Sequence, residues 1–254
     1  MNHVKPEIMR RIFILGMLLG ITLFSEAQST GNVRDIDGNE YGTVKIGDQV
    51  WMLQNIRATR YADGTAIPKV SGEKRWENLE PGEKAYCWLR NDSTTFAETY
   101  GALYTWGAAV NYSGNQTSNS SWVQGVCPDG WHVPGDEEFK QLEMHLGMTR
   151  EEADKRKLRG TTEGCMIAGN AELWADGRLK QNPDFGKSGF MAVPGGLRYV
   201  TGKFGDYQLD AYWWTSTSLD DMKAFGRIIP SKDIESYRDA HRKDAGFSVR
   251  CLKD

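Results

Sequence analysis

Apolar and polar side chains alternate over residues 43–46 and again over residues 49–52, and Gly47-Asp48 separates the two runs. Two alternating runs joined by a two-residue turn that contains glycine are typical of a β-hairpin. Residues 85–92 form another short apolar run, which ends in Asn and Asp and so predicts a strand entering a turn.

A helical period is clearest over residues 135–147, where Phe139, Leu142 and Leu146 form one apolar stripe and Gly147 ends the pattern. The first turn carries three consecutive carboxylates, which complement the helix dipole and are expected to face solvent: Asp136, Glu137 and Glu138. This stretch is therefore predicted to be an amphipathic helix with a solvated acidic start.

Two further helices are predicted on weaker patterns. One begins at a T-x-x-E capping box formed by Thr149 and Glu152, and Gly160 closes it. The other covers residues 99–110, with Thr99 as its N-cap. Its apolar positions at helical spacing are Leu103, Trp106 and Val110.

From Gly164 to Asp254, short apolar runs alternate with Gly, Asn and Asp turns, which predicts a meander of short antiparallel strands. Two or three helices followed by such strands indicate an α+β fold with an irregular antiparallel sheet. Residues 111–122 are polar and of low complexity, so we expect an exposed loop there. No long linker marks a boundary, and residues 28–254 are expected to form a single domain.

The first 27 residues have the features of a secretory signal peptide. A basic stretch precedes an apolar run over residues 12–24, and Ser25-Glu26-Ala27 provides small residues at a cleavage site. The apolar run is too short for a membrane span. We therefore expect export to the periplasm, the cell surface or the extracellular space, with no membrane insertion after the signal is removed.

The remaining composition excludes several classes of function. The net charge of −3 provides no basic surface for nucleic acid, so no nucleic-acid partner is expected. No G-x-S-x-G, H-E-x-x-H, G-x-G-x-x-G or phosphate-loop motif occurs, and we predict no catalytic residues, no cofactor and no metal site. Asp35, Asp37 and Asn39 resemble part of a calcium loop, but Gly38 is misplaced, so we interpret them as a turn.

The main chemical question is whether the cysteines form structural disulfides or include a reactive thiolate. An even number in an exported chain favours disulfides, but Cys87, Cys127, Cys165 and Cys251 allow three pairings. Cys127 could be a reactive thiolate activated by His132, or one end of a bridge to Cys251. Such a bridge would close a loop of about 120 residues and remove about 4–5 kcal/mol of unfolded-state entropy. Cys87 and Cys165 form a second bridge or stay free.

Tryptophan is unusually frequent, with nine in the chain. Aromatic faces beside short polar side chains are typical of surfaces that bind sugars or peptides. In a strand, Trp213 and Trp214 point to opposite faces, so we expect one to be buried and the other nearer the surface. The predicted ligand-binding surface comprises Arg198, Tyr199, Tyr207, Tyr212, Trp213, Trp214, Asp220 and Asp221.

An ordered series of motifs runs from Val33 to Asp254 and includes "YGTVKIGDQVWMLQNI", "AYCWLRND", "YGALYTWGAA", "CPDGWHVPGDEEF", "SGFMAVPGGLR", "YWWTSTS" and "GFSVRCLKD". Together these motifs resemble the Fibrobacter succinogenes major paralogous domain. This family is bacterial, occurs on exported and surface proteins and has no established activity. The resemblance therefore identifies a domain more than a function.

A more distant similarity concerns "WHVPGDEEF", "WWTSTS" and the closing "GFSVRC", which together resemble the formylglycine-generating, sulfatase-modifying enzymes. This similarity implies a C-type-lectin-like fold and a bridge between Cys127 and Cys251. The oxidases of that group need an additional cysteine pair before the final segment, and residues 228–245 contain no cysteine. Formylglycine-generating activity is accordingly not expected, and fold alone does not give function.

Three hypotheses of function follow. The favoured one is an exported, non-catalytic binding module whose partner is a glycan, a peptide or a surface protein. The second is a divergent hydrolase or oxidase with candidate residues His132, Asp136, Arg227 and His241. The third is a structural subunit of a surface complex, which an unpaired edge strand or an exposed apolar patch would favour.

Overall fold

The computed structural model describes residues 28–114 and 122–254. The predicted signal peptide (residues 1–27) and most of the predicted polar loop (residues 115–121) lie outside the described residues. A five-stranded antiparallel sheet contains the N-terminal hairpin. Its strands, in spatial order, are β1 (Gln28–Arg34), β2 (Glu40–Ile46), β3 (Gln49–Met52), β13 (Leu252–Lys253) and β6 (Trp131–His132).

The predicted hairpin is confirmed. Strands β2 and β3 pair antiparallel, with Ile46 opposite Gln49 and Thr43 opposite Met52. Gly47 takes a φ of 59°, which a glycine adopts at little cost in a tight turn. The alternation buries Val44 and Ile46 on one face of β2.

A second antiparallel sheet is formed by the C-terminal half, as the meander pattern predicts. Its strands, in spatial order, are β10 (Asp210–Ser218), β11 (Lys223–Pro230), β12 (Ser236–Arg242) and β7 (Lys157–Arg159). Two short pairs complete the strands: β4 (Tyr86–Trp88) with β5 (Ala102–Tyr104), and β8 (Leu197–Arg198) with β9 (Phe204–Gly205). Strand β4 lies within the predicted strand over residues 85–92.

The helices are shorter and more numerous than the two or three predicted. In the described part of the chain they are α1 (Glu73–Glu77), α2 (Ser93–Tyr100), α3 (Trp106–Ala109), α4 (Asp136–His145), α5 (Arg150–Asp154), α6 (Glu163–Ile167) and α7 (Arg178–Gln181), with single 3₁₀ turns η1 (Leu89–Asn91) and η2 (Ala171–Leu173). Helices of four or five residues display less than two turns of periodicity, so their sequences give little signal.

The two helices predicted around residues 135–160 are confirmed in part. Helix α4 has the expected start and stripe, and Thr149 caps α5 by accepting a hydrogen bond from the backbone N–H of Glu152. However, α5 ends at Asp154 rather than near Gly160. The reason is tertiary, because the residues that follow α5 extend and pair with β12 as strand β7.

The single helix predicted over residues 99–110 is wrong. Asp92, and not Thr99, caps α2, and Gly101 ends that helix with a φ of 74°. The chain then extends as β5 before Thr105 caps the short helix α3. The apolar residues that match a helical stripe are therefore divided between a strand and a helix.

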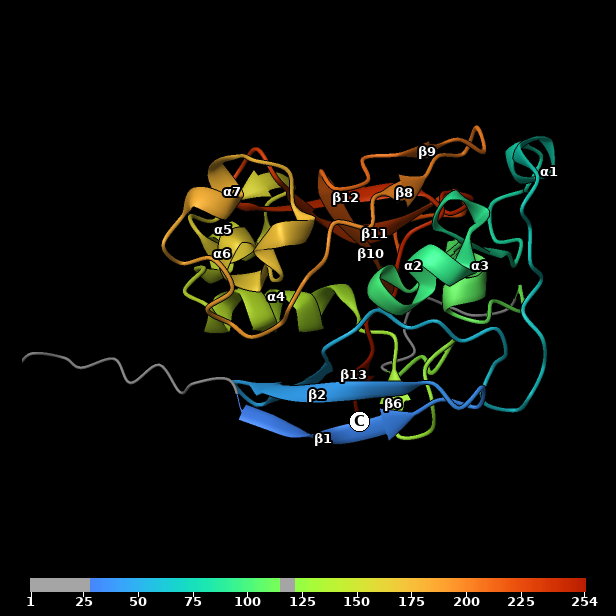
Figure 1. The fold of residues 1–254 in the computed structure, drawn as a ribbon, viewed down its shortest axis with the longest axis horizontal. Helices are drawn as coiled ribbons and strands as arrows, with labels where there is room; N and C mark the ends of the chain where they lie inside the picture. Colours follow the sequence, from blue (N-terminus) through green and yellow to red (C-terminus); the bar gives the residue numbers. More distant parts are fainter. Residues whose placement is uncertain (1–27, 115–121) are drawn as a thin grey trace, which may run out of the picture.

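Both sheets and the helices enclose an aromatic core. In Figure 1 the five-stranded sheet lies along the lower side and the four-stranded sheet along the upper side, with α4 to α7 on the left and α1 to α3 on the right. Trp213 and Trp214 are 1% and 0% exposed, so the expectation that one of them lies near the surface is wrong. Both faces of β10 are covered, since Trp213 packs edge-on against Phe190 while Trp214 stacks on Phe247.

The architecture is thus a mixed α+β fold with mostly antiparallel sheets and one disulfide. Within residues 28–114 and 122–254, no helix has the length and apolar character needed to cross a membrane.

Candidate functional site

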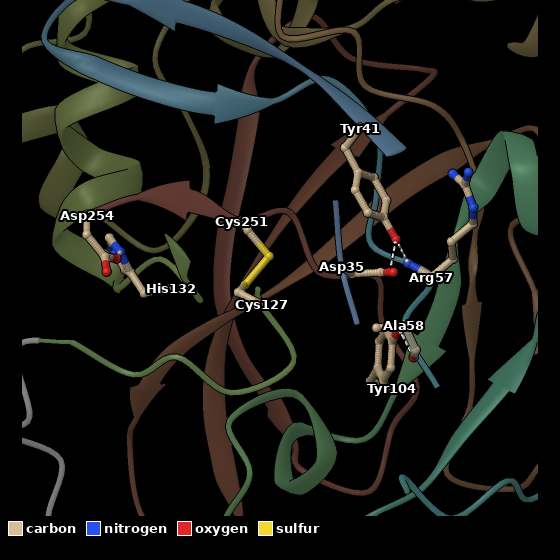
Figure 2. The surroundings of a disulfide bond; sticks show 9 residues. All are labelled: Asp35, Tyr41, Arg57, Ala58, Tyr104, Cys127, His132, Cys251 and Asp254. Carbon is tan, nitrogen blue, oxygen red and sulfur yellow. Dashed lines mark hydrogen bonds and ion pairs between the residues drawn. A yellow bond between two sulfur atoms is a disulfide. The ribbon is translucent and has the colours of Figure 1, made fainter. Parts of the chain in front are cut away.

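The disulfide predicted between Cys127 and Cys251 is present, with the two Cα atoms 5.9 Å apart (Figure 2). The bridge joins the segment before β6 to the residue before β13, two strands that also pair with each other. Cys127 is therefore part of the scaffold and is not a nucleophile, which answers the question raised by its position near His132.

The other two cysteines do not form the second bridge considered from the sequence. Cys87 and Cys165 are both buried free thiols that belong to different apolar clusters. Burial raises the pKa of Cys87 to about 12 and that of Cys165 to about 11. Neither thiol has the thiolate character that reactive cysteines need.

His132 lies beside the disulfide and is held between two carboxylates. Its Nδ1 is 2.8 Å from Oδ1 of Asp254, and its Nε2 is 2.9 Å from Oε1 of Glu138. A neutral imidazole can donate only one hydrogen bond, so two carboxylate partners favour the doubly protonated ring. Burial by itself would lower the pKa of His132, but hydrogen bonds and charges from Glu138 and Asp254 outweigh it and raise the pKa.

Asp136 is not the solvated carboxylate that its position in a first helical turn predicts. It is buried, because Arg227 and Arg238 project from the four-stranded sheet beneath α4 and neutralise its charge. The distance from Oδ1 to Nη1 of Arg227 is 2.7 Å, and from Oδ2 to Nη2 of Arg238 it is 2.6 Å. Glu137, in contrast, remains exposed as expected and pairs with Arg150.

A second buried carboxylate on α4 extends this cluster. Glu143 contacts Nε of Arg227 at 3.1 Å, pairs with Arg159 from β7, and accepts a hydrogen bond from Ser236 at 2.7 Å. We define the α4 ion network as Asp136, Glu143, Arg159, Arg227 and Arg238. Its members join one helix to three strands, so the network fixes α4 on the sheet.

The four residues considered for an enzyme are not assembled at one centre. Asp136 and Arg227 meet in the α4 ion network, whereas His132 lies between Glu138 and Asp254. His241 packs against the ring of Phe247 at 5.1 Å, and burial lowers its pKa. None of these four residues lines either of the two hollows described below.

The structure divides the predicted aromatic surface into buried and exposed parts. Arg198, Tyr212, Trp213 and Trp214 are buried. The guanidinium of Arg198 lies between the rings of Trp76 and Phe204, and it donates hydrogen bonds to the backbone carbonyls of Val70 and Ser71. These four side chains serve the core and present almost no surface to a ligand.

The remaining predicted residues lie at two places. Tyr199 is exposed, and its hydroxyl donates to Asp206, which also accepts from Tyr212. Tyr207 is half-buried and packs against α2. The other two members, Asp220 and Asp221, are exposed in the turn between β10 and β11. Their role in binding stays a prediction.

A groove that the sequence does not predict runs along α2. One hollow, of about 510 Å³, is lined by residues that include Asp37, Asn39, Arg57, Thr59, Trp88 and Glu98. A second, of about 310 Å³, is lined by residues that include Gln54, Glu98, Thr99, Asn170, Met191 and Arg250. Glu98 lines both hollows, so they adjoin, and together they are called the α2 groove below.

The first hollow is built on a turn that the sequence does predict. Asp35 holds the turn between β1 and β2, because its carboxylate accepts hydrogen bonds from the backbone N–H groups of Asp37 and Asn39 and from the hydroxyl of Tyr41. Asp37 in turn accepts hydrogen bonds from Thr59 and Arg60. The oxygens that resemble a calcium loop are therefore engaged within the protein. Nowhere in the described ranges do three His, Cys, Asp or Glu side chains gather as a metal site.

Arg57 is the fixed cation of the first hollow. Its Nε donates to Oδ1 of Asn39 at 3.1 Å, and its guanidinium lies 5.1 Å from the ring centre of Tyr41 (Figure 2). Its Nη2 is 3.0 Å from Oε2 of Glu98. The side chain of Arg57 is 11% exposed and that of Glu98 is 84% exposed, so a largely covered cation meets a carboxylate on the surface. Within the described residues, the buried Nη1 of Arg57 has no hydrogen-bond partner.

Arg250 is the cation of the second hollow. It is fully buried, and its nitrogens donate to Oδ1 of Asn55 and to the backbone carbonyls of Met52 and Phe190. In the part of the chain that the structure describes, none of its hydrogen-bond partners is a carboxylate. Burial lowers the pKa of Arg250 to about 9, which leaves it charged at neutral pH.

Strained backbone surrounds α2. Asn170 and Met191, which line the second hollow, have φ values of 52° and 60°. Four more non-glycine residues with positive φ precede α2 or flank Tyr207, which packs on α2: Arg90, Asn91, Asp206 and Gln208. Such conformations are energetically costly and cluster at functional sites. No local motif marks the groove, because segments far apart in the sequence supply its walls.

Comparison with known protein families shows a match over most of the described chain. The model of the Fibrobacter succinogenes major domain matches residues 44–253, which include the hairpin turn with β3, both bridged cysteines, α2 and the four-stranded sheet. The match confirms the resemblance given by the ordered motifs. No curated protein and no solved structure matches the chain.

Proposed function

Because this chain belongs to the Fibrobacter succinogenes major domain family, we propose that it is an exported, non-catalytic module that binds an extended glycan in the α2 groove. The observation that carries the proposal is the adjoining of the two hollows along one helix. A groove longer than one hollow suits a chain-like ligand, whereas a small metabolite prefers one enclosed cavity.

The chemistry of the lining supports a carbohydrate. Hydroxyl and amide side chains supply both donors and acceptors, as the many hydroxyl groups of a sugar require: Gln54, Ser93 and Thr99. Ala97 and Met191, which are half-buried, add apolar surface for the faces of sugar rings. The strained backbone around α2 supports a binding role for this region.

Export and a lectin-like fold are part of the same proposal. The disulfide between Cys127 and Cys251 supports an oxidising compartment, where structural disulfides persist. A C-type-lectin-like arrangement is supported by that bridge near the C-terminal strand and by α4 packing on an irregular antiparallel sheet. An experimental structure that does not superpose on C-type-lectin-like domains would overturn this assignment of the fold.

Binding is tested first by a glycan array and then by titration calorimetry on the hits. In the variant Ala97→Trp, an indole fills the first hollow, and we expect affinity to fall at least about tenfold because ligand atoms and the new ring compete for one volume. Glu77→Trp adds the same ring to an exposed position of α1 outside the groove, and its affinity should equal that of the native protein.

Two outcomes would overturn the proposal. Equal affinity of the two tryptophan variants for a bound glycan would move the binding site away from the groove. Failure of every glycan, combined with capture of a peptide or a surface protein, would assign the module to a different class of ligand.

A further inference from the structure

We propose that the glycan is acidic, and that its carboxylate displaces Glu98 from Arg57. This inference rests on the proposed function, because it assigns the chemical class of the ligand to the same groove. It starts from the unequal burial of the two partners. The side chain of Arg57 is 11% exposed, whereas that of Glu98 is 84% exposed.

Arg57 is held in position without Glu98. Asn39 accepts a hydrogen bond from Nε, and the Tyr41 ring lies against the guanidinium. Tyr41 is itself fixed, because its hydroxyl donates to Asp35 at 2.6 Å and accepts from the backbone N–H of Arg57 at 3.0 Å. The guanidinium is therefore preorganised to receive an anion.

Glu98 has the properties of an internal substitute for that anion. It projects from α2 at the junction of the two hollows, and its carboxylate meets Nη2 of Arg57 at 3.0 Å. Glu98 is 84% exposed, so water solvates its carboxylate when it leaves Arg57, and moving it aside costs little. Arg57 also has a second terminal nitrogen, Nη1, which is buried and has no partner in the described residues, so Glu98 does not use the full hydrogen-bonding capacity of the guanidinium.

The charges along the groove agree with this assignment. Two guanidiniums, of Arg57 and Arg250, and two carboxylates, of Asp37 and Glu98, line the groove. Asp37 is already paired with Arg60 at 2.6 Å, and Arg250 has no carboxylate partner among the described residues. When Glu98 moves away from Arg57, two guanidiniums without a paired carboxylate face the groove, and a repeating acidic sugar would neutralise them.

The probe pair is an oligogalacturonate and its fully methyl-esterified form, which share a sugar backbone and differ in charge. We expect the native protein to bind the acid at least about tenfold more tightly than the ester, since a hydrogen bond to a charged group outweighs a neutral one. The preference should weaken as salt concentration rises.

Three variants test the role of Glu98. Glu98→Gln should tighten binding of the acid by about two- to fivefold, the range of an exposed ion pair, and leave the ester unchanged. The matched control Glu77→Gln removes an exposed helical glutamate outside the groove and should change neither affinity. Arg57→Gln should abolish the preference for the acid, and Glu98→Gln provides the test if Arg57→Gln does not fold.

The outcomes separate the two proposals. Equal binding of acid and ester by the native protein would overturn the acidic ligand and leave a neutral glycan as the occupant. Weaker binding of the acid by Glu98→Gln would show that Glu98 holds the ligand instead of yielding to it. If neither form binds and no neutral glycan binds, the proposed function fails and this inference fails with it.

Discussion

Asp136 on α4 and Arg227 on β11 form a buried ion pair, with Oδ1 of the carboxylate 2.7 Å from Nη1 of the guanidinium. Arg227 also donates to the backbone carbonyl of Asp136 at 3.0 Å, so the same side chain satisfies both groups at the start of the helix. The pair therefore fixes the N-terminus of α4 on the four-stranded sheet and is not a catalytic dyad in an open pocket.

Removing one charge of this pair should be strongly destabilising. Asp136→Asn leaves Arg238 buried without its carboxylate and Arg227 with Glu143 alone, and we expect the free energy of unfolding to fall by about 3–5 kcal/mol. Denaturant titration followed by tryptophan fluorescence measures the loss. Glu137→Gln, one residue away and exposed, should cost less than about 1 kcal/mol. Similar losses in the two variants would contradict the structural role of the α4 ion network.

The buried carboxylate of Asp136 should also determine how the free energy of unfolding responds to acid. Burial by itself would raise the pKa of Asp136, but hydrogen bonds from Arg238 and the charge of Arg227 outweigh it and hold the pKa well below its ordinary value. A group whose pKa is depressed in the folded state stabilises above its unfolded pKa of about 3.9, and this stability is lost as pH falls toward the folded value.

Unfolding free energy measured from pH 6 downward should therefore fall steeply below about pH 4 in the native protein. In Asp136→Asn the curve should be flatter over the same window, because the variant has no such proton to bind. Parallel curves would assign the acid sensitivity to other carboxylates.

Two described histidines should have pKa values shifted in opposite directions from the ordinary value. His132, between Glu138 and Asp254, has a raised pKa, whereas burial lowers the pKa of His241. NMR titration of the ring Cε1–H signals should place one midpoint above and one below the ordinary value of about 6.5. Asp254→Asn should lower the midpoint of His132 and leave that of His241 unchanged. A His132 midpoint below 6.5 would mean that the two carboxylates do not hold the ring protonated.

The sign of the linkage follows from the raised pKa of His132. A group with a raised folded pKa contributes stability that is fully present below its unfolded pKa, and that stability is lost as pH rises through the folded value. The contribution of His132 should therefore be present below about pH 6.5 and decline above it. Comparing native protein with His132→Gln across pH 5 to 9 tests this, since the stability difference between them should shrink as pH rises.

The disulfide should provide a large part of the stability. Cys127 and Cys251 are 124 residues apart, and closing a loop of that size is worth about 4–5 kcal/mol in the chain-entropy model. We expect the double variant Cys127→Ser, Cys251→Ser to lose about that amount in denaturant titration. Cys165→Ala removes a buried free thiol and serves as the control. Thiol counting on the denatured, unreduced protein should find two free thiols, and a count of four would rule out the bridge.

The sequence predicts those elements whose signals are local. The turn at Gly47-Asp48 and the stripe of α4 depend on neighbours a few residues away, and both are found. The use of cysteine in an exported chain favoured a bridge from Cys127 to Cys251 over a reactive thiol, and the family resemblance agreed with that pairing. By contrast, the burial of Asp136 depends on Arg227 and Arg238 from distant strands, and no helical pattern contains that information.

The α2 groove could not be predicted from the sequence, because its walls also come from distant segments. Arg57, Glu98 and Arg250 come from three separated segments, and each looks like an ordinary surface charge in its own context. The aromatic residues chosen from the sequence were mostly core, because a high tryptophan content does not distinguish packing from binding. Trp213 and Trp214 illustrate this, since a strand covered on both faces buries both rings.

Gly101 connects the fold to the proposed site, and its replacement should affect both. It has a φ of 74°, and a Cβ atom there would lie 2.7 Å from Cβ of Asn55 and 2.8 Å from the carbonyl oxygen of Ile56. Asn55 in turn donates to the carbonyl of Tyr100 at the end of α2. Gly101→Ala should therefore cost about 2–5 kcal/mol, from backbone strain and overpacking together, and displace α2.

Gly64→Ala separates the cost of backbone strain from the cost of overpacking. Gly64 has a φ of 86° but no atom within 4 Å of the position a Cβ would take, so its replacement adds strain without a clash. We expect a loss of about 1–2 kcal/mol and unchanged binding. Gly101→Ala should lose more stability and also weaken binding of any ligand held along α2. If Gly101→Ala keeps full affinity at a temperature where it is folded, then the exact position of α2 does not control the groove, and the binding surface must lie elsewhere.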